Sequence, residues 1–163
     1  MGKKLDAIKQ KSAEGKETFR AGQELGKKAV SDTKQMKSLI DSLPTDVDDE
    51  IVDAAKAVSE GTKSDAENYM QSEVSSKVEA GKKSMDASSK AASDQVKNNE
   101  QVKATFERMD GVGSFGKGAR DTGRGRIDQS TQEFNNAISE NERDATVAEQ
   151  EYQKELSDIS STF

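Results

Sequence analysis

The residues closest to known chemistry form a glycine-rich segment. Residues 111–118 read GVGSFGKG, which contains the G-x-G-x-x-G spacing of dinucleotide-binding turns and differs by one residue from a phosphate-binding P-loop. A P-loop needs Ser or Thr after its lysine to reach magnesium, and Gly118 stands there. Both motifs also need a buried strand just before them, whereas residues 102–110 have the apolar spacing of a helix. We therefore expect no nucleotide site and no cofactor.

Four cations follow these glycines: Lys117, Arg120, Arg124 and Arg126. Side chains of this type bind the phosphates of nucleic acids or lipid headgroups. Four charges with one aromatic neighbour, Phe115, are too few for specific nucleic-acid recognition, and a wide apolar face for membrane binding is lacking. We favour a local role, in which the cations neutralise nearby acidic helix ends. With Phe106, Asp110 and Phe115 they are also the candidate partner-binding residues.

The composition removes most enzyme classes. The 163 residues include no His, no Cys and no Trp, so the chain offers no imidazole base, no thiolate nucleophile and no zinc site of the usual ligand types. Residues 46–50 (DVDDE) begin like a calcium loop, but the glycine at its sixth position and the glutamate at its twelfth are missing. These carboxylates are better placed to cap a helix that follows Pro44, with Thr45 as the capping residue. We expect neither a metal site nor catalysis.

Large apolar residues are scarce. Leu, Ile, Val and Phe make up 26 of 163 residues, and the net charge is −6. A wide core is excluded, whereas a narrow seam between long helices needs fewer apolar groups. The sequence shows neither a cleavable secretory signal nor an apolar run of membrane-spanning length. We expect a soluble protein that is cytoplasmic before any export that does not depend on a signal peptide.

Apolar and small residues recur every three or four positions through most of the chain, which is the period of packed helices. The pattern predicts helices over about 3–43, 46–110 and 127–160, with a break near residue 61 left open and a Gly/Arg-rich loop over 111–126. The predicted fold is all-α: one helical domain built as an elongated antiparallel three-helix bundle or coiled-coil rod.

Three glycines, Gly15, Gly22 and Gly26, fall on the apolar stripe of the first helix. Each costs up to about 1 kcal/mol inside a helix, yet a missing side chain lets another backbone approach closely. We interpret them as close-packing positions of the seam; the alternative is a weak, fraying helix. The seam is completed by three phenylalanines: Phe19, Phe134 and Phe163.

The two terminal segments carry opposite charge. Residues 1–43 have 10 basic and 6 acidic groups (net +4), whereas residues 127–163 have 2 basic and 9 acidic groups (net −7). Such helices either pack beside each other on the central helix or meet between molecules. The second arrangement predicts a filament or scaffold component whose assembly dissolves at high salt.

Residues 64–163 resemble the helical hairpins of type VII secretion substrates of the WXG and LXG kind. The resemblance rests on two long helices joined by a short glycine turn with Val112, Phe115 and Gly116, and on the aromatic-x-x-x-acid spacing of Phe106 and Asp110. The Trp-x-Gly turn of that family is absent. The resemblance implies export without a cleaved signal, a helical partner or self-association, and recognition of the aromatic and acid pair. The expected function is therefore a non-catalytic, secretion-linked substrate or adaptor.

A second resemblance points to another class. Residues 54–97 are similar to late-embryogenesis-abundant proteins, which are rich in Ala, Lys, Ser and Glu and lack Cys and Trp. That resemblance implies a stress-protective chain that gains helix only on drying or on membranes. A cooperative melt in lipid-free buffer would exclude it.

Overall fold

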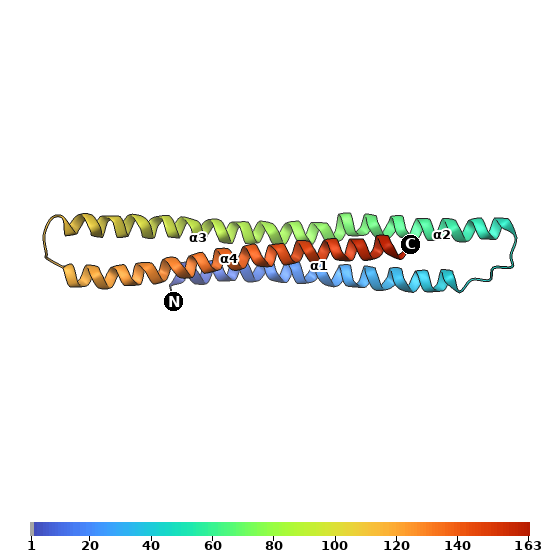
Figure 1. Ribbon diagram of the computed structural model, residues 1–163, viewed down its shortest axis with the longest axis horizontal. Coiled ribbons are helices and arrows are strands. Elements are labelled where there is room, and N and C mark those ends of the chain that lie inside the picture. Colours follow the sequence, from blue (N-terminus) through green and yellow to red (C-terminus); the bar gives the residue numbers. More distant parts are fainter. Residues whose placement is uncertain (1) are drawn as a thin grey trace. The chain divides into compact units, whose positions relative to one another are not determined.

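The computed structural model describes residues 2–163 and is 91% helical, with no strand among these residues. The helices are α1 (Lys3–Asp41), α2 (Asp49–Tyr69), the short π-helix η1 (Met70–Val74), α3 (Ser75–Asp110) and α4 (Lys117–Thr162), as labelled in Figure 1. Long helices pack in three pairs, α1 with α3, α3 with α4 and α1 with α4. The predicted all-α helical bundle is confirmed. The oppositely charged α1 and α4 pack beside each other within one chain.

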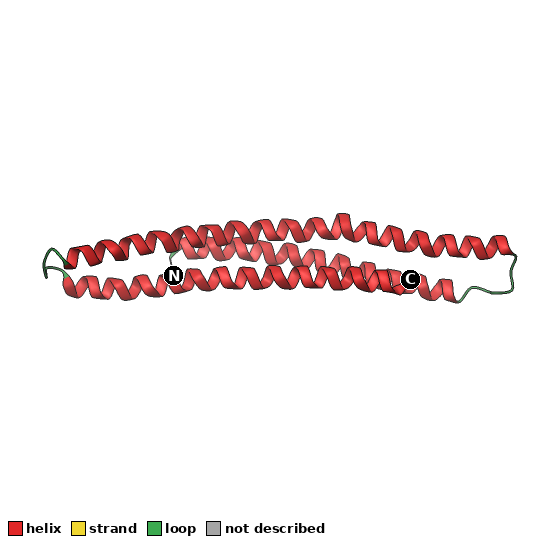
Figure 2. Ribbon diagram, turned by 45° about the horizontal axis from the view of Figure 1, so that its top comes forward, coloured by secondary structure: helices red, strands yellow, loops and turns green. Residues whose placement is uncertain are grey.

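Contacts divide the chain into two compact units. The first unit holds the residues up to Gly15 together with Lys83–Ala145, and the second holds Lys16–Lys82 and Thr146–Phe163. Each unit therefore takes a piece of α1, α3 and α4, and the second also contains α2 and η1. Figure 2 shows that loops occur at the α1–α2 and α3–α4 connections.

A small apolar cluster fills the first unit. Leu5 and Ile8 of α1 meet Ala92 of α3 and Phe134 and Ala137 of α4, and all five are buried. One heptad step further along α4, a polar side chain continues the seam. Asn141, only 2% exposed, accepts a hydrogen bond from Ser12 of α1 (2.7 Å) and donates one to Ser88 of α3 (3.0 Å). A buried polar layer of this kind favours one helix register, because any slip leaves its groups unpaired.

The second unit is packed through glycines. At Gly81 of α3 an added Cβ would lie 2.5 Å from Cδ1 of Phe19, and at Gly22 of α1 it would lie 2.8 Å from Cβ of Lys77. The two glycines thus leave room for the side chains of Phe19 and Lys77, which an added side chain would displace. Gly26 of this unit is also buried, as is Gly15 of the first unit. Phe163, which ends the chain, is half-buried.

There is no break at residue 61, which the sequence left open, because α2 continues through Gly61 and the π-helix η1 follows it. The apolar stripe here advances by four residues several times in succession, through Ala66, Met70, Val74 and Val78. A regular α-helix has 3.6 residues per turn and rotates such a stripe off the seam. The wider π turn absorbs the excess, and Met70 and Val74 are completely or almost completely buried.

Two helix starts differ from expectation. The second helix begins at Asp49 with Asp48 at its N-cap, so Thr45 does not cap it. The larger correction concerns α4, which begins at Lys117 rather than near Ile127, so that the loop is residues 111–116 instead of 111–126. The physical reason is packing: an added Cβ at Gly123 would lie 2.9 Å from Phe106 of α3. This glycine serves as a close-packing position in a helix, and the contact with α3 outweighs its low helix propensity.

Candidate functional site: the α3–α4 tip

The segment that joins α3 to α4 presents apolar side chains to solvent. Phe115 is 96% exposed and Val112 is 91% exposed, more than any other large apolar residue of the described chain. We call residues 108–126 the tip. The turn at its centre is tight, because Gly116 has a φ of +75° that L side chains rarely adopt. Amides of residues 111–113 bond to the last carbonyls of α3 and so complete its C-terminus.

One arginine holds this loop from inside. Arg120, in the first turn of α4, is only 8% exposed. Its Nε donates to Oδ1 of Asp110 at 2.9 Å, its Nη2 donates to the Gly113 carbonyl at 3.1 Å, and its Nη1 donates to the Phe115 carbonyl. The planar guanidinium thus joins the end of α3, the loop and the start of α4. The backbone on either side of Val112 and Phe115 is fixed while their side chains stay in solvent.

The acidic member of this cluster is shared. Asp110 also accepts a hydrogen bond from Arg124, which pairs with Asp121 at 2.6 Å. Hydrogen bonding from Arg120, and then from Arg124, holds the pKa of Asp110 below its usual range. Lys117 pairs with the same Asp121 at 3.1 Å.

These contacts correct the expectation that all four cations bind a partner. Arg120 is buried and fully engaged, and Arg124 is largely covered by its two carboxylates. Both arginines instead have the local role that we favoured from the sequence, because they neutralise a carboxylate at a nearby helix end. Arg126 is exposed and makes no ion pair within the described residues, and the same holds for Arg108, which donates to the hydroxyl of Thr105. Arg108 was missed because it lies on the helical side of the glycine segment.

The aromatic candidates separate in the same way. Phe106 is half-buried against Gly123 and belongs to the α3–α4 contact, whereas Phe115 points away from the helices into solvent. Phe106 and Asp110 both have structural contacts within the hairpin. Phe115 is therefore the candidate that remains free to bind.

A second exposed apolar surface lies in the other unit and was not singled out from the sequence. At the α1–α2 connection Leu39, Leu43 and Ile51 are 66%, 48% and 56% exposed. We call residues 39–53 the acidic turn, because they carry six carboxylates and no Lys or Arg. Figure 1 shows that this turn extends beyond the end of α4. The periodicity placed Leu43 and Ile51 on apolar stripes, but it could not show that no third helix covers them.

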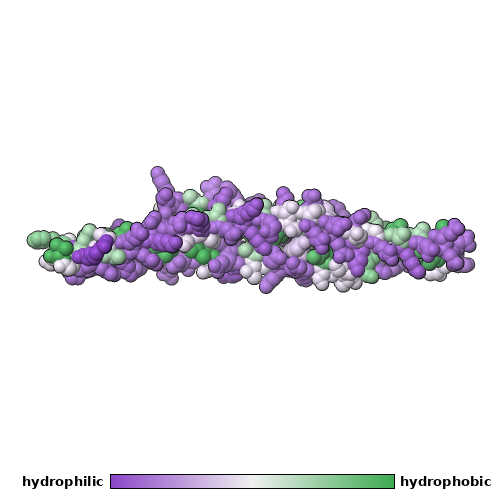
Figure 3. Space-filling view, turned by 90° about the horizontal axis from the view of Figure 1, so that it is seen from above, coloured by the Kyte–Doolittle hydropathy of each residue, from purple (hydrophilic) through white to green (hydrophobic). Residues whose placement is uncertain are grey.

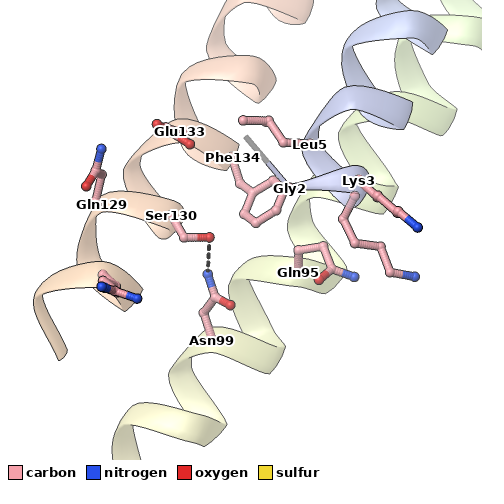
Figure 4. Close-up of a pocket in the computed structure, with 11 residues that line it drawn as sticks. Gly2, Lys3, Leu5, Gln95, Asn99, Gln129, Ser130, Glu133 and Phe134 are labelled. Atoms are coloured by element: carbon pink, nitrogen blue, oxygen red, sulfur yellow. Dashed lines mark hydrogen bonds between the residues drawn. The ribbon is translucent and has the colours of Figure 1, made fainter. Parts of the chain in front are cut away.

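A hollow lies in the first unit, where α1 begins between α3 and α4. Figure 4 shows Leu5 and Phe134 at its floor, with Gln95 and Gln129 at its sides, and the Asn99 amide donating to Ser130 at 3.1 Å. The volume is about 770 Å³. Its polar lining combines amides and a hydroxyl with four charged side chains, two lysines and an arginine beside Glu133. Within residues 2–163 no three potential metal ligands of the His, Cys, Asp or Glu type come together.

Most of the surface in the view of Figure 3 is hydrophilic, and the hydrophobic residues form small, separate patches. Among the described helices none is both long and apolar enough to cross a membrane. No protein-family model, curated protein or solved structure matches the chain.

Proposed function

We propose that this chain is a non-catalytic helical interaction protein that binds another protein through the α3–α4 tip. The observation that supports this most strongly is the pairing of a buried Arg120 with an exposed Phe115. A flexible loop would lose conformational entropy when it is ordered on binding, whereas this loop is already held by three hydrogen bonds of one guanidinium. Aromatic side chains on a fixed backbone are typical anchors of protein interfaces.

The secretion-linked role remains a prediction. The hairpin of α3 and α4 has the expected form of two long helices and a short turn. However, Phe106 and Asp110 are occupied within the hairpin, so a receptor for this aromatic and acid pair would have to read it together with the tip. The geometry favours Phe115 as the contact residue.

Site-specific crosslinking tests the proposal. A photoreactive benzophenone amino acid placed at position 115 should form a covalent adduct with a partner protein when cells that make the chain are irradiated. The matched control is position 147, where valine is 50% exposed on α4, well away from the tip in sequence. Adding Arg120→Met to the position-115 variant should reduce the adduct, because the loop is then no longer held. Equal labelling at 115 and 147, or none at 115, would refute binding through the tip.

A further inference from the structure

The tip and the acidic turn are opposite in charge and alike in apolar character. The tip carries five basic and two acidic residues, while the acidic turn carries six acidic residues and no basic one. Two of the tip cations, Arg108 and Arg126, have no carboxylate partner within the described chain. In the acidic turn only Asp41 is paired, with Lys37 at 2.6 Å, and the other five carboxylates form no ion pair among the described residues.

Both surfaces also expose large apolar side chains, and this exposure does not stabilise a monomer. Phe115 and Val112 are almost wholly in solvent, and Leu39, Leu43 and Ile51 are about half exposed or more. Contact between two such groups removes apolar area from water, and unpaired charges around them steer the encounter. The chain thus supplies both halves of a complementary pair.

We propose that the tip of one copy binds the acidic turn of a second copy, with Phe115 against Leu39, Leu43 and Ile51 and with Arg108 and Arg126 facing the unpaired carboxylates. This inference rests on the proposed function and names the partner. Pairing of like surfaces is disfavoured, because tip with tip brings cations together and turn with turn brings carboxylates together. The contact is therefore heterologous: each copy uses one surface to bind and offers the other.

The full chain in analytical ultracentrifugation gives the first test. At low salt the weight-average mass should rise with concentration above the 17.7 kDa of one chain. The screening length falls from about 30 Å at 0.01 M salt to about 3 Å at 1 M, so we expect the dissociation constant to rise roughly tenfold or more across that range. Phe115→Ser and Leu39→Ser should each remain at the mass of one chain. Val147→Ser, which alters an exposed apolar residue elsewhere, should associate as the unchanged chain does.

Mixing the two defective variants separates this contact from every like-with-like alternative. Phe115→Ser keeps an intact acidic turn and Leu39→Ser keeps an intact tip, so the mixture can form one productive contact and should give a dimer. Failure of the mixture to associate, with both variants folded by circular dichroism, would overturn the heterologous contact. Both substitutions lie in solvent-exposed positions, so folding should persist.

The outcomes also distinguish this inference from the function on which it rests. A chain that stays at the mass of one copy at all concentrations and at low salt overturns self-association. If position 115 nevertheless crosslinks to a different protein, the proposed binding function stands with another partner. If position 115 crosslinks to nothing and the chain does not associate, both proposals fail.

Discussion

Glu155 of α4 is a buried carboxyl group in the second unit, and replacing it should stabilise the protein at neutral and higher pH. The residue is 6% exposed, and its Oε2 has no hydrogen-bond partner. A Cβ added at Gly26 would lie 2.6 Å from its Cδ, so the carboxyl group rests against the backbone of α1. Burial raises the pKa of Glu155 to about 7, and the neighbouring Glu151 and Asp158 add to the effect while Lys27 opposes it.

The size of the effect follows from this pKa. In the unfolded chain the group ionises near 4.5, whereas in the folded chain it keeps its proton up to about pH 7. Below pH 4.5 the group is protonated in both the folded and the unfolded chain, so it does not change the free energy of unfolding. Between 4.5 and 7 the unfolded state releases the proton first, so the free energy of unfolding falls by up to about 1.4 kcal/mol per pH unit. Above 7 the loss is constant at about 3 kcal/mol.

Urea denaturation of the unchanged chain and of Glu155→Gln at pH 5 and pH 8, followed by circular dichroism, measures this loss. The amide cannot ionise, so the variant should gain about 2–3 kcal/mol more at pH 8 than at pH 5, relative to the unchanged chain. Glu60→Gln on the exposed face of α2 controls for removing one negative charge from an acidic protein. An effect of Glu155→Gln that is the same at both pH values would refute the reasoning.

Four other substitutions test the packing and the tip. Gly26→Ala places a methyl group against the Glu155 carboxyl, the far end of a flexible side chain that must then shift. In urea denaturation it should therefore gain less than Gly61→Ala, which has open space around it and should stabilise by about 0.5–1 kcal/mol. Arg120→Met should speed amide hydrogen exchange in residues 111–116 and leave exchange in the second unit unchanged. Equal exchange rates for residues 111–116 in the variant and the unchanged chain would contradict the role of Arg120 in holding the loop. Asn141→Leu removes the hydrogen bonds that join α4 to Ser12 and Ser88, while the two serines keep each other and the Ile8 carbonyl as partners. It should cost about 0.5–1.5 kcal/mol in urea denaturation, and no change would show that this polar layer does not contribute to stability.

The helices could be predicted from the sequence because their seams repeat at helical period. In α1 the stripe from Leu5 to Thr33 lies on the buried side. Beyond Thr33 the spacing no longer predicts burial, since Met36 and Leu43 continue the stripe but are about half exposed. Periodicity identifies one face of a helix, and only the lengths of the other helices decide whether that face is covered.

Polar seam positions were missed for a related reason. Asn141 and Glu155 continue the heptad spacing of α4, yet a search for apolar residues passes over both. Their burial depends on partners from other helices, Ser12 and Ser88 in one case and the bare backbone at Gly26 in the other. The start of α4 was misplaced for the same kind of reason, because Gly123, one of the glycines that suggested a loop, makes room for Phe106.

The measurement that tests the central claim most directly is crosslinking of the purified chain with a benzophenone at position 115, followed by mass spectrometry of the linked peptides. We predict adducts between position 115 of one copy and residues 39–53 of another, which weaken at high salt and disappear with Leu39→Ser. The account would be contradicted if position 115 yielded no intermolecular adduct, or if its adducts lay outside the acidic turn and were unaffected by Leu39→Ser.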